Sequence, residues 1–375
     1  MNRASIVVVG GGPAGSATAT LLARSGHAVT LVEKSASAHE TVCGEFLSGE
    51  SCAYLHALGV CVKELAARPI HTLRIAANTC IAEQPLPFAS WSLRRSVLDE
   101  ALRETAAAAG VTVVRGTSVE ELLQQPAGWA VRLSDGRVLA CNEAFLATGK
   151  NDLRGRARGK GKQNDLVAFK VHLQLSPEQT EDLRECIELI TFHGGYAGLQ
   201  LVDGDLATLA ILINKKTLHQ HGPQWNRVLP YLLKSSDHLE RRLSASRIIF
   251  ERPLALSALP YGYQRAGSND GLWAVGDQAA VIPSFTGDGI SIALHSAFLA
   301  TESYADGKSA DQYQHELASQ LRYPITLATY LSRSVINVPR LVEIVGRWPS
   351  LITYLARSTR IPQRYRKYSE LLHDC

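Results

Sequence analysis

The hydrophobic pattern of the first thirty-five residues changes its period twice. A short apolar run from Ile6 to Val9 is typical of a buried β-strand. From Ala14 to Arg24 small and apolar residues recur at helical spacing, and Gly26 is placed to end that helix. A second apolar segment, Ala28 to Val32, leads directly to Glu33. The pattern therefore predicts a strand, a helix and a second strand that closes on an acid.

A glycine motif spans the junction between the first strand and the helix. Gly10, Gly12 and Gly15 form the motif G-x-G-x-x-G, which permits a tight turn, close approach of a pyrophosphate and close helix–strand packing. The helix N-terminus offers free N–H groups to phosphates, and Glu33 can accept hydrogen bonds from ribose hydroxyls. The glycines alone also fit an ordinary turn. The order of the elements predicts a dinucleotide site, with NAD and FAD both open at this point.

Further motifs lie at the ends of other predicted strands and helices. They are R-x-x-L-D from Arg95 to Asp99, A-T-G ending at Gly149, G-D at Gly276 and Asp277, and P-x-x-x-G-x-G from Pro283 to Gly289. Together with the first motif they resemble the FAD-dependent aromatic hydroxylase and geranylgeranyl reductase superfamily, to which group A flavoprotein monooxygenases are related. The resemblance spans residues 5 to 302 and implies FAD as the cofactor.

The resemblance also implies which residues contact the cofactor. Asp277 matches the ribityl aspartate of the family, and the glycines after it place backbone N–H groups at the isoalloxazine. NAD(P)H is expected as a transient reductant, although the D-G pair that aromatic hydroxylases carry after the A-T-G strand is missing. The expected cofactor-binding residues are Gly10, Gly12, Pro13, Ala14, Gly15, Glu33, Lys34, Cys43, Gly44, Arg95, Gly149, Asp277, Gly287, Asp288, Gly289 and Ile290.

The implied fold is α/β, with a Rossmann-like FAD-binding domain of the glutathione-reductase type. Residues 1–71, 89–165 and 261–305 are expected to form that domain. Residues 72–88 and 166–260 alternate in strand fashion, which predicts a mostly antiparallel substrate-binding sheet interleaved with it. Helical pieces are expected to interrupt this sheet near residues 177–189 and 223–244. Residues 306–375 are expected to form a helical C-terminal region.

The predicted sheet suggests where a substrate binds. If one face covers the flavin, four side chains are candidates to line it, and ordinary packing in the sheet core is the alternative for each of them. The expected pocket residues are Phe192, Tyr196, Leu199 and Gln200. The apolar composition of these strands predicts a small lipophilic substrate.

The segment T-V-C-G-E-F, ten residues beyond Glu33, is expected to cross the flavin. Gly44 would let the backbone approach the cofactor because it has no Cβ. Geranylgeranyl reductases also carry a Cys-Gly pair here, which places a thiol near the reacting face. Cys43 and Glu45 are therefore the candidate catalytic residues, with a proton-donor role for Cys43. The alternative for Cys43 is a small buried residue that only fills space.

Composition and charge add limits to this interpretation. The chain has 375 residues, 46% of them hydrophobic, and a net charge of +4, which is too small to indicate nucleic acid as a partner. The cysteines form no C-x-x-C pair, and no metal-ligand spacing is present. No secretory signal or membrane span is expected, so the predicted location is cytoplasmic.

The C-terminal region differs in charge from the rest. Between Arg333 and Lys367 it holds eight basic residues and one acid, Glu343, next to apolar residues at helical spacing. Such a surface fits an acidic carrier protein or the periphery of a membrane, and a solvated arginine face is the alternative. The basic loop from Arg154 to Lys162 is expected to be a solvated loop.

The expected activity is that of an FAD-dependent oxidoreductase of secondary metabolism. The first hypothesis is an NAD(P)H- and O2-dependent monooxygenase that hydroxylates a lipophilic aromatic or polyketide-like molecule through a flavin C4a-hydroperoxide. The second is a reductase or dehydrogenase of an isoprenoid-like alkene, although the Y-x-W-x-F-P stretch of geranylgeranyl reductases is missing where this chain has G-Y-A-G-L-Q-L-V. The third is a halogenase with Lys150 or Lys170 as its reactive lysine, although the halogenase signature W-x-W-x-I-P is missing.

Overall fold

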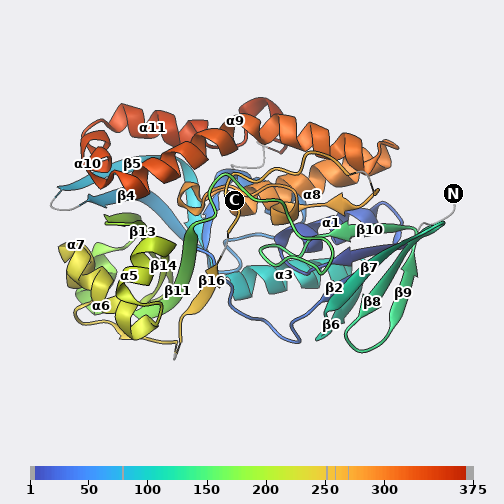
Figure 1. Cartoon of the computed structure of the whole chain (residues 1–375), viewed down its shortest axis with the longest axis horizontal. Coiled ribbons are helices and arrows are strands. Elements are labelled where there is room, and N and C mark those ends of the chain that lie inside the picture. Colours follow the sequence, from blue (N-terminus) through green and yellow to red (C-terminus); the bar gives the residue numbers. More distant parts are fainter. Residues whose placement is uncertain (1–4, 78–79, 251, 258, 269, 369–375) are drawn as a thin grey trace.

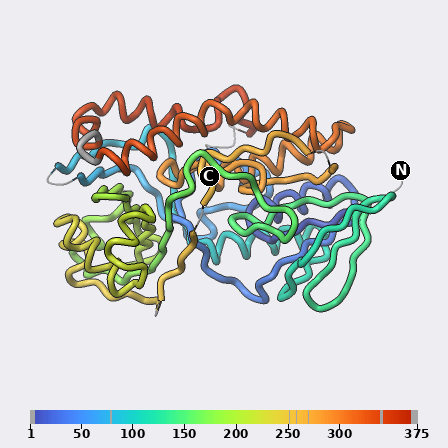
Figure 2. Tube along the Cα trace, in the orientation of Figure 1, coloured from blue at the N-terminus to red at the C-terminus, as the bar shows by residue number. Residues whose placement is uncertain are grey.

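The fold combines two sheets and a layer of C-terminal helices. The computed structural model describes residues 5–368 except 78, 79, 251, 258 and 269. Figure 1 shows a parallel sheet and its helices at one end of the molecule and a second sheet with its own helices at the other. The C-terminal helices run along one side of both. The tube in Figure 2 shows that the chain passes between the two ends more than once, which makes both units discontinuous in sequence.

The parallel sheet has the strand order β17-β10-β1-β2-β6, and all of its pairs are parallel. Its core strands are apolar on both faces, because helices α1, α3 and α8 pack on one side and a small antiparallel sheet covers the other. This arrangement confirms the predicted Rossmann-like unit. The elements are β1 (Ser5–Val9), α1 (Pro13–Arg24), β2 (Ala28–Glu33), α3 (Arg95–Ala108), β6 (Thr112–Arg115), β10 (Glu143–Leu146), β17 (Trp273–Ala274) and α8 (Gly289–Ala305).

A small three-stranded sheet extends the same end of the molecule. Its strands β7 (Val119–Gln125), β8 (Gly128–Leu133) and β9 (Val138–Cys141) pair in antiparallel fashion. Trp129 and Val131 turn inward onto the parallel sheet and join the core formed with Val7 and Leu146. The meander therefore belongs with the predicted FAD-binding unit.

The second sheet is mostly antiparallel, as the sequence predicted. Its order is β15-β11-β14-β13-β12-β4-β5-β3, with β16 also pairing β11, and β12 runs parallel to β4. Its strands are β3 (Phe46–Ser48), β4 (Arg68–Ala77), β5 (Cys80–Ser92), β11 (Leu166–Gln174), β12 (Cys186–Phe192), β13 (Gly195–Asp203), β14 (Leu206–Asn214), β15 (Arg247–Ile248) and β16 (Leu254–Ser257).

The two faces of this sheet have different neighbours. Phe169 and Val171 of β11 point to the face that helices α5, α6 and α7 cover. Ala168, Lys170 and His172 alternate with them and point to the other face, toward the FAD-binding end. The helices are α4 (Pro177–Asp182), α5 (Lys215–His221), α6 (Trp225–Ser235) and α7 (Asp237–Leu243).

The sheet reaches further along the chain than the predicted segments. β4 begins at Arg68 and β5 ends at Ser92, and β3 adds a strand from the segment T-V-C-G-E-F onward. The helical piece expected near residues 177–189 is a short helix followed by β12, which pairs with β4. The predicted domain limits at residues 1–4 and 369–375 lie outside the described residues.

The C-terminal helices form a separate layer. A capping box at Ser309 and Gln312 starts α9. The inner sides of the next two helices pack on the second sheet, where Val342 and Ile352 contact Ile75 and its neighbours. Within the described part of the chain, no helix is both long and apolar enough to cross a membrane. The remaining elements are α2 (Gly49–Ala57), α9 (Ala310–Asn337), α10 (Pro339–Gly346), α11 (Pro349–Ser358), and the 3-10 turns η1 (Gly276–Gln278), η2 (Ser284–Thr286) and η3 (Gln363–Tyr365).

Candidate functional site

One cavity of about 600 Å³ joins the parallel sheet to the second sheet. Its first part lies at the carboxyl ends of β1, β2 and β10, where open α/β sheets bind ligands. Its far part reaches the strands β11, β14 and β16 of the second sheet. The volume is within the range of roughly 300–1,000 Å³ that is usual for ligand sites. The cavity therefore brings a dinucleotide cradle and a second, distinct region into one space.

The glycine turn after β1 has the geometry expected of a cofactor cradle. Gly10 has φ +105°, a conformation that L side chains rarely adopt, and it makes the sharp turn. A Cβ at Gly15 would lie 1.8 Å from the Gly10 carbonyl oxygen, so Gly15 serves helix packing and does not line the cavity. A Cβ at Gly12 would instead point into open space, 3.9 Å from its nearest neighbour, Arg95 Nη2. These glycines fit a pyrophosphate against the backbone, as predicted for FAD.

Glu33 is fixed at the end of β2. Its Oε2 accepts a hydrogen bond from the Gly11 N–H and its Oε1 one from the Ser35 N–H, both at 2.8 Å. The side chain is buried but still belongs to the cavity wall. The carboxylate is therefore held in the position from which it would bind the ribose of FAD.

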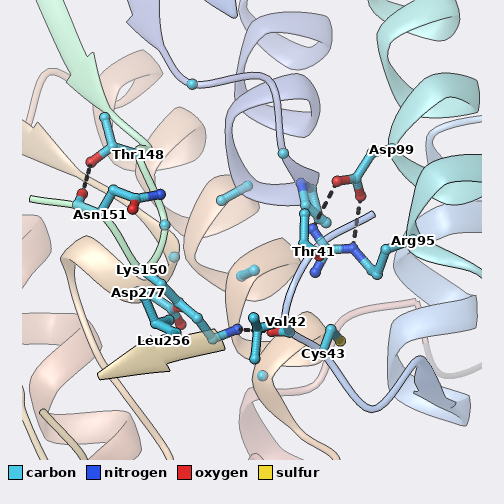
Figure 3. A pocket seen from close by; sticks show the side chains of 18 of the residues that line it. Thr41, Val42, Cys43, Arg95, Asp99, Thr148, Lys150, Asn151, Leu256 and Asp277 are labelled. Carbon is cyan, nitrogen blue, oxygen red and sulfur yellow. Dashed lines mark hydrogen bonds and ion pairs between the residues drawn. The ribbon is translucent and has the colours of Figure 1, made fainter. Parts of the chain in front are cut away.

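Two arginines from α3 close the side of the cradle. Arg95 pairs with Asp99 through two hydrogen bonds of 2.8 Å, one turn apart on the helix (Figure 3). Burial lowers the pKa of Arg95, but Asp99 and Cys43 more than offset this and raise it above its usual range. One turn further, Arg103 donates to the Gly11 carbonyl at 2.9 Å and is almost fully buried. The first arginine lies beside the pyrophosphate position, and the second holds the glycine turn.

The turn before α8 lies opposite the glycine turn. Asp277, Gly287, Gly289 and Ile290 all line the cavity, and α8 begins at Gly289 with its N-terminus toward the cavity. Asp288 differs from the prediction: its buried carboxylate points away from the cavity and pairs with Arg360 at 2.9 Å. Only its backbone remains available to a cofactor. Its side chain ties the turn to the C-terminal segment.

Gly149 and Lys150 form a third wall. Lys150 reaches across the cavity and donates to the Val42 carbonyl at 3.0 Å, which Figure 3 shows as a dashed line. Thr148 donates to the Asn151 carbonyl at 2.7 Å and closes the turn after β10. Lys150 therefore holds the segment before Cys43 over the cofactor region.

The segment Cys43-Gly44-Glu45 is a tight turn with a charged anchor. Glu45 has φ +62°, which costs free energy for a residue with a side chain, and its N–H donates to Cys43 Sγ at 3.3 Å. Its buried carboxylate is bound by the Arg95 N–H at 2.9 Å and by two side chains from β11, Lys170 and His172. The hydrogen bonds and the ion pair of this carboxylate offset the free-energy cost of the strained backbone at Glu45.

The anchor is a cluster of four charged or polar groups. Lys170 Nζ lies 2.9 Å from Glu40 Oε2 and 2.6 Å from Glu45 Oε1, and His172 Nε2 lies 2.8 Å from Glu45 Oε2. Burial raises the pKa of Glu40, but Lys170 and further donors outweigh it and hold this pKa well below its usual range. Glu40, Glu45 and His172 also have the spacing of metal ligands. The Lys170 ammonium contacts both carboxylates, and Arg94 also pairs with Glu40 at 2.8 Å, so the arrangement is that of an ion-pair cluster.

The far end of the cavity is apolar. Its walls come from the second sheet and from the turn before η2, and almost all of their side chains are aliphatic. The lining residues there are Ala168, Phe169, Ala210, Ile211, Leu212, Leu254, Leu256, Leu259, Val281 and Ile282. A lipophilic molecule that binds beyond the cofactor would contact these walls.

The structure places none of the four predicted pocket residues among those that line the cavity. Phe192 and Leu199 point to the face covered by α5, α6 and α7 and belong to its core. Tyr196 and Gln200 point to the other face, but Tyr196 packs against Phe285 and Gln200 donates to the Gly44 carbonyl at 2.9 Å. This corrects the predicted pocket. Side chains alternate between the two faces along β12 and β13, and this alternation places Phe192 and Leu199 on the face away from the cavity. Contacts with Phe285 and Gly44 engage Tyr196 and Gln200.

Several residues of the site were not predicted. Arg103 had a signal in the sequence, because Arg95, Asp99 and Arg103 follow one another at intervals of four on one helix face. Lys170 and His172 had none for this role, because their partner Glu45 lies more than 120 residues away. The remaining cofactor residues predicted from the sequence, Pro13, Ala14, Lys34 and Gly44 among them, all line the cavity, and their contacts with FAD stay a prediction.

Comparisons with known proteins agree with this site. Residues 3–138 match the family described as "FAD binding domain". The menaquinone reductase of Mycolicibacterium smegmatis is 27% identical over 367 residues, which cover 92% of this chain and 87% of that protein. The flavin-dependent halogenase armH1 of Armillaria mellea is 26% identical over 353 residues, 84% of this chain and 67% of that protein.

A solved structure shows the same fold. The flavin-dependent brominase Bmp2 superposes with a TM-score of 0.78 at 16% identity, covering 99% of this chain and 97% of that one. The resemblance stated from the sequence is thus confirmed: residues 3–138 carry an FAD-binding domain, and the chain is similar in sequence to a menaquinone reductase and in fold to a flavin-dependent brominase. It is an FAD-dependent oxidoreductase.

Proposed function

We propose that this oxidoreductase reduces an alkene in a lipophilic, isoprenoid-like substrate. The observation that carries the proposal is the continuity of the cavity, in which the cofactor cradle opens directly onto the apolar walls of the second sheet. The similarity to a menaquinone reductase over 92% of the chain supports it, since menaquinone is a quinone with an isoprenoid chain. This was the second hypothesis from the sequence and now takes precedence over oxygenation.

The residues of the chain divide the work between binding and proton supply. When bound and reduced by an external donor such as NAD(P)H, the flavin would supply a hydride to the alkene and return to its oxidised form. The α8 N-terminus with Gly287 and Gly289 would hold the ring, and the apolar walls would hold the alkene and exclude water. Cys43 lines the cavity, contacts the Arg95 guanidinium and accepts the Glu45 N–H at its Sγ. From that position Cys43 would deliver the proton that completes reduction of the alkene.

The test is turnover of the FAD-loaded protein under nitrogen. Menaquinone and a short prenyl alcohol are supplied with NADH, NADPH or dithionite, and the product is analysed by mass spectrometry for the gain of two hydrogen atoms. Ala210→Phe, which narrows the apolar end, should retain FAD and lose turnover. Failure of every donor to support alkene reduction, with the flavin bound and reducible, would exclude the proposal.

The same experiment in air separates the other two activities. Incorporation of one oxygen atom with matching oxygen uptake would establish the monooxygenase of the first hypothesis. Halogenation has less structural support at Lys170, because its Nζ is held by two carboxylates and the residue does not line the cavity. Lys150 does line the cavity, and Lys150→Met would abolish halogenation if this residue were the reactive lysine.

A further inference from the structure

Exposed apolar side chains gather in the C-terminal helices. The described chain exposes eleven large hydrophobic side chains, and seven of them fall within one stretch of about thirty residues. Tyr330 is 73% exposed and Trp348 is 64% exposed, the two highest values. The seven are Tyr323, Tyr330, Val338, Ile344, Trp348, Leu351 and Tyr354, and we call them the aromatic surface. Scattered single exposures are normal in proteins, whereas a concentration of this kind marks an interaction site.

The fold does not account for these side chains. The same helices already bury an inner side, where Ile336, Val342 and Ile352 enter the core. Trp348 and Leu351 are exposed and take no part in those contacts. The aromatic surface is therefore additional to the packing that holds the helices in place.

The members of the surface lie close to one another. The side chains of Tyr323 on α9 and Tyr354 on α11 interact directly through a hydrogen bond. Tyr330 lies two helical turns from Tyr323, on the same side of α9, and Leu351 lies one turn from Tyr354 on α11. The helix α10 contacts both α9 and α11. Figures 1 and 2 show the three helices together along one side of the molecule.

Positive charge surrounds the aromatic surface. Arg322, Arg333, Arg347 and Arg357 are exposed on the same helices. Between residues 322 and 368 the sequence contains nine arginines and lysines and a single acid, Glu343. Three of the nine, Arg360, Arg366 and Lys367, pair with acids elsewhere in the fold, so the exposed arginines named above carry the charge of this surface. Tyrosine and tryptophan favour the boundary between water and lipid, and arginine binds anionic phosphate groups. The two features together match an anionic bilayer.

We propose that the aromatic surface and its arginines dock the protein peripherally on an anionic lipid bilayer. A second copy of the chain would bring arginines against arginines, and an acidic protein would pair the arginines but leave the aromatic side chains without a comparable partner. A bilayer provides phosphates at the level of the arginines and acyl chains for Trp348 and Leu351. The proposal goes beyond the activity and does not depend on it, because docking requires no turnover.

Co-sedimentation with vesicles tests the proposal on the FAD-loaded protein without substrate. Binding should be strong to vesicles of phosphatidylglycerol and phosphatidylcholine, weak to phosphatidylcholine alone, and reduced by high salt. The charge reversal Arg347→Glu with Arg357→Glu should weaken binding by on the order of tenfold or more. Trp348→Ser with Tyr354→Ser should also weaken it. Val138→Ser, which removes a 59% exposed side chain from β9 at the other end of the molecule, is the matched control and should bind as the parent does.

A second measurement checks insertion at one residue. Brominated lipids should quench the fluorescence of the parent protein, and Trp348→Phe should remove most of that quenching, since Trp91, Trp129 and Trp273 are buried. Trp225 is partly buried on α6, where it packs against the core of the second sheet and not in the C-terminal helices. Equal binding by the parent and both double variants would overturn the proposal. So would a parent protein that ignores the vesicles and instead forms dimers, or binds an acidic protein, through the aromatic surface.

Discussion

The ammonium of Lys170 and the carboxylate of Glu45 meet at 2.6 Å, although the residues lie 125 positions apart in the chain. Both side chains are completely buried. Lys170 belongs to β11 of the second sheet, and Glu45 belongs to the turn that crosses the cofactor region. This pair therefore connects the two units of the protein at the place where the cavity passes from one to the other.

Removal of one partner of this pair should destabilise the whole fold. In Lys170→Met, Glu45 would remain buried without its ammonium partner, whereas Glu40 would keep Arg94, and the loss should cost about 3–5 kcal/mol of the free energy of unfolding. The double variant with Glu45→Gln should lose less than the sum of the two single changes, because the pair is coupled. Urea denaturation measures both effects. Arg184→Met breaks an exposed ion pair with Glu181 and should leave the midpoint unchanged. A small effect of Lys170→Met would contradict this account.

Gly12→Ala should separate folding from cofactor binding. The added Cβ meets no protein atom closer than 3.9 Å, so the free energy of unfolding of the FAD-free protein should hardly change. FAD affinity should fall about tenfold to hundredfold, because the methyl group enters the pyrophosphate position. The control is Gly198→Ala on β13, whose Cβ would lie 4.0 Å from its nearest neighbour. Fluorescence of released FAD reports the affinity, and an unchanged value would mean that the pyrophosphate lies elsewhere.

Asp288→Asn should change how stability depends on pH. Burial raises the pKa of Asp288 to about 7, despite the nearby Arg360 and Arg366 and with Glu50 adding to the rise. Between about pH 4 and pH 7 the folded state then holds a proton that the unfolded state has released, so this group's contribution to stability falls as pH rises. The asparagine variant lacks this loss. Its free energy of unfolding should therefore rise relative to that of the parent by on the order of 3–4 kcal/mol between pH 4 and pH 7.

The comparison between the two proteins is needed because other groups oppose Asp288. Burial lowers the pKa of His295 to about 4, so its contribution to stability rises between pH 4 and its unfolded value of 6.5. His295 contributes equally to the free energy of unfolding of the parent and of Asp288→Asn, so its contribution cancels in the difference between them. A difference that stays constant from pH 4 to pH 7 would show that Asp288 is ionised throughout. Glu50 still pairs with Arg360 in the variant, which keeps that cation neutralised.

Arg103→Met should loosen the glycine turn. The guanidinium of Arg103 donates to the Gly11 carbonyl at 2.9 Å and is almost fully buried. Loss of this charged hydrogen bond should cost about 1.5–3 kcal/mol and weaken FAD binding with it. Arg115 pairs with the same acid, Glu100, but is 29% exposed, so Arg115→Met is the matched control. Equal effects of the two variants on FAD affinity would show that the contact with Gly11 is unimportant.

The local part of the fold was predictable because its causes are local. The strand, the glycine turn, the helix and Glu33 follow one another within thirty residues, and each property of the turn depends on a residue beside it. Arg95 and Asp99 were identified from their resemblance to the family's R-x-x-L-D motif, which is also local, and their interval of four residues on one helix places them in contact. The sequence by itself thus determined the cofactor cradle and the FAD-binding half of the cavity.

The tertiary structure alone decided the other half. Alternation along β13 and β11 shows that two faces exist, but only the docking of α5, α6 and α7 decides which face becomes core. Hence Leu199 left the predicted pocket, and Lys170 and His172 joined Glu45 instead. Asp288 turned toward Arg360 because the C-terminal segment folds back under α8. Contacts between residues so far apart depend on how whole elements pack, and no short pattern in the chain records that.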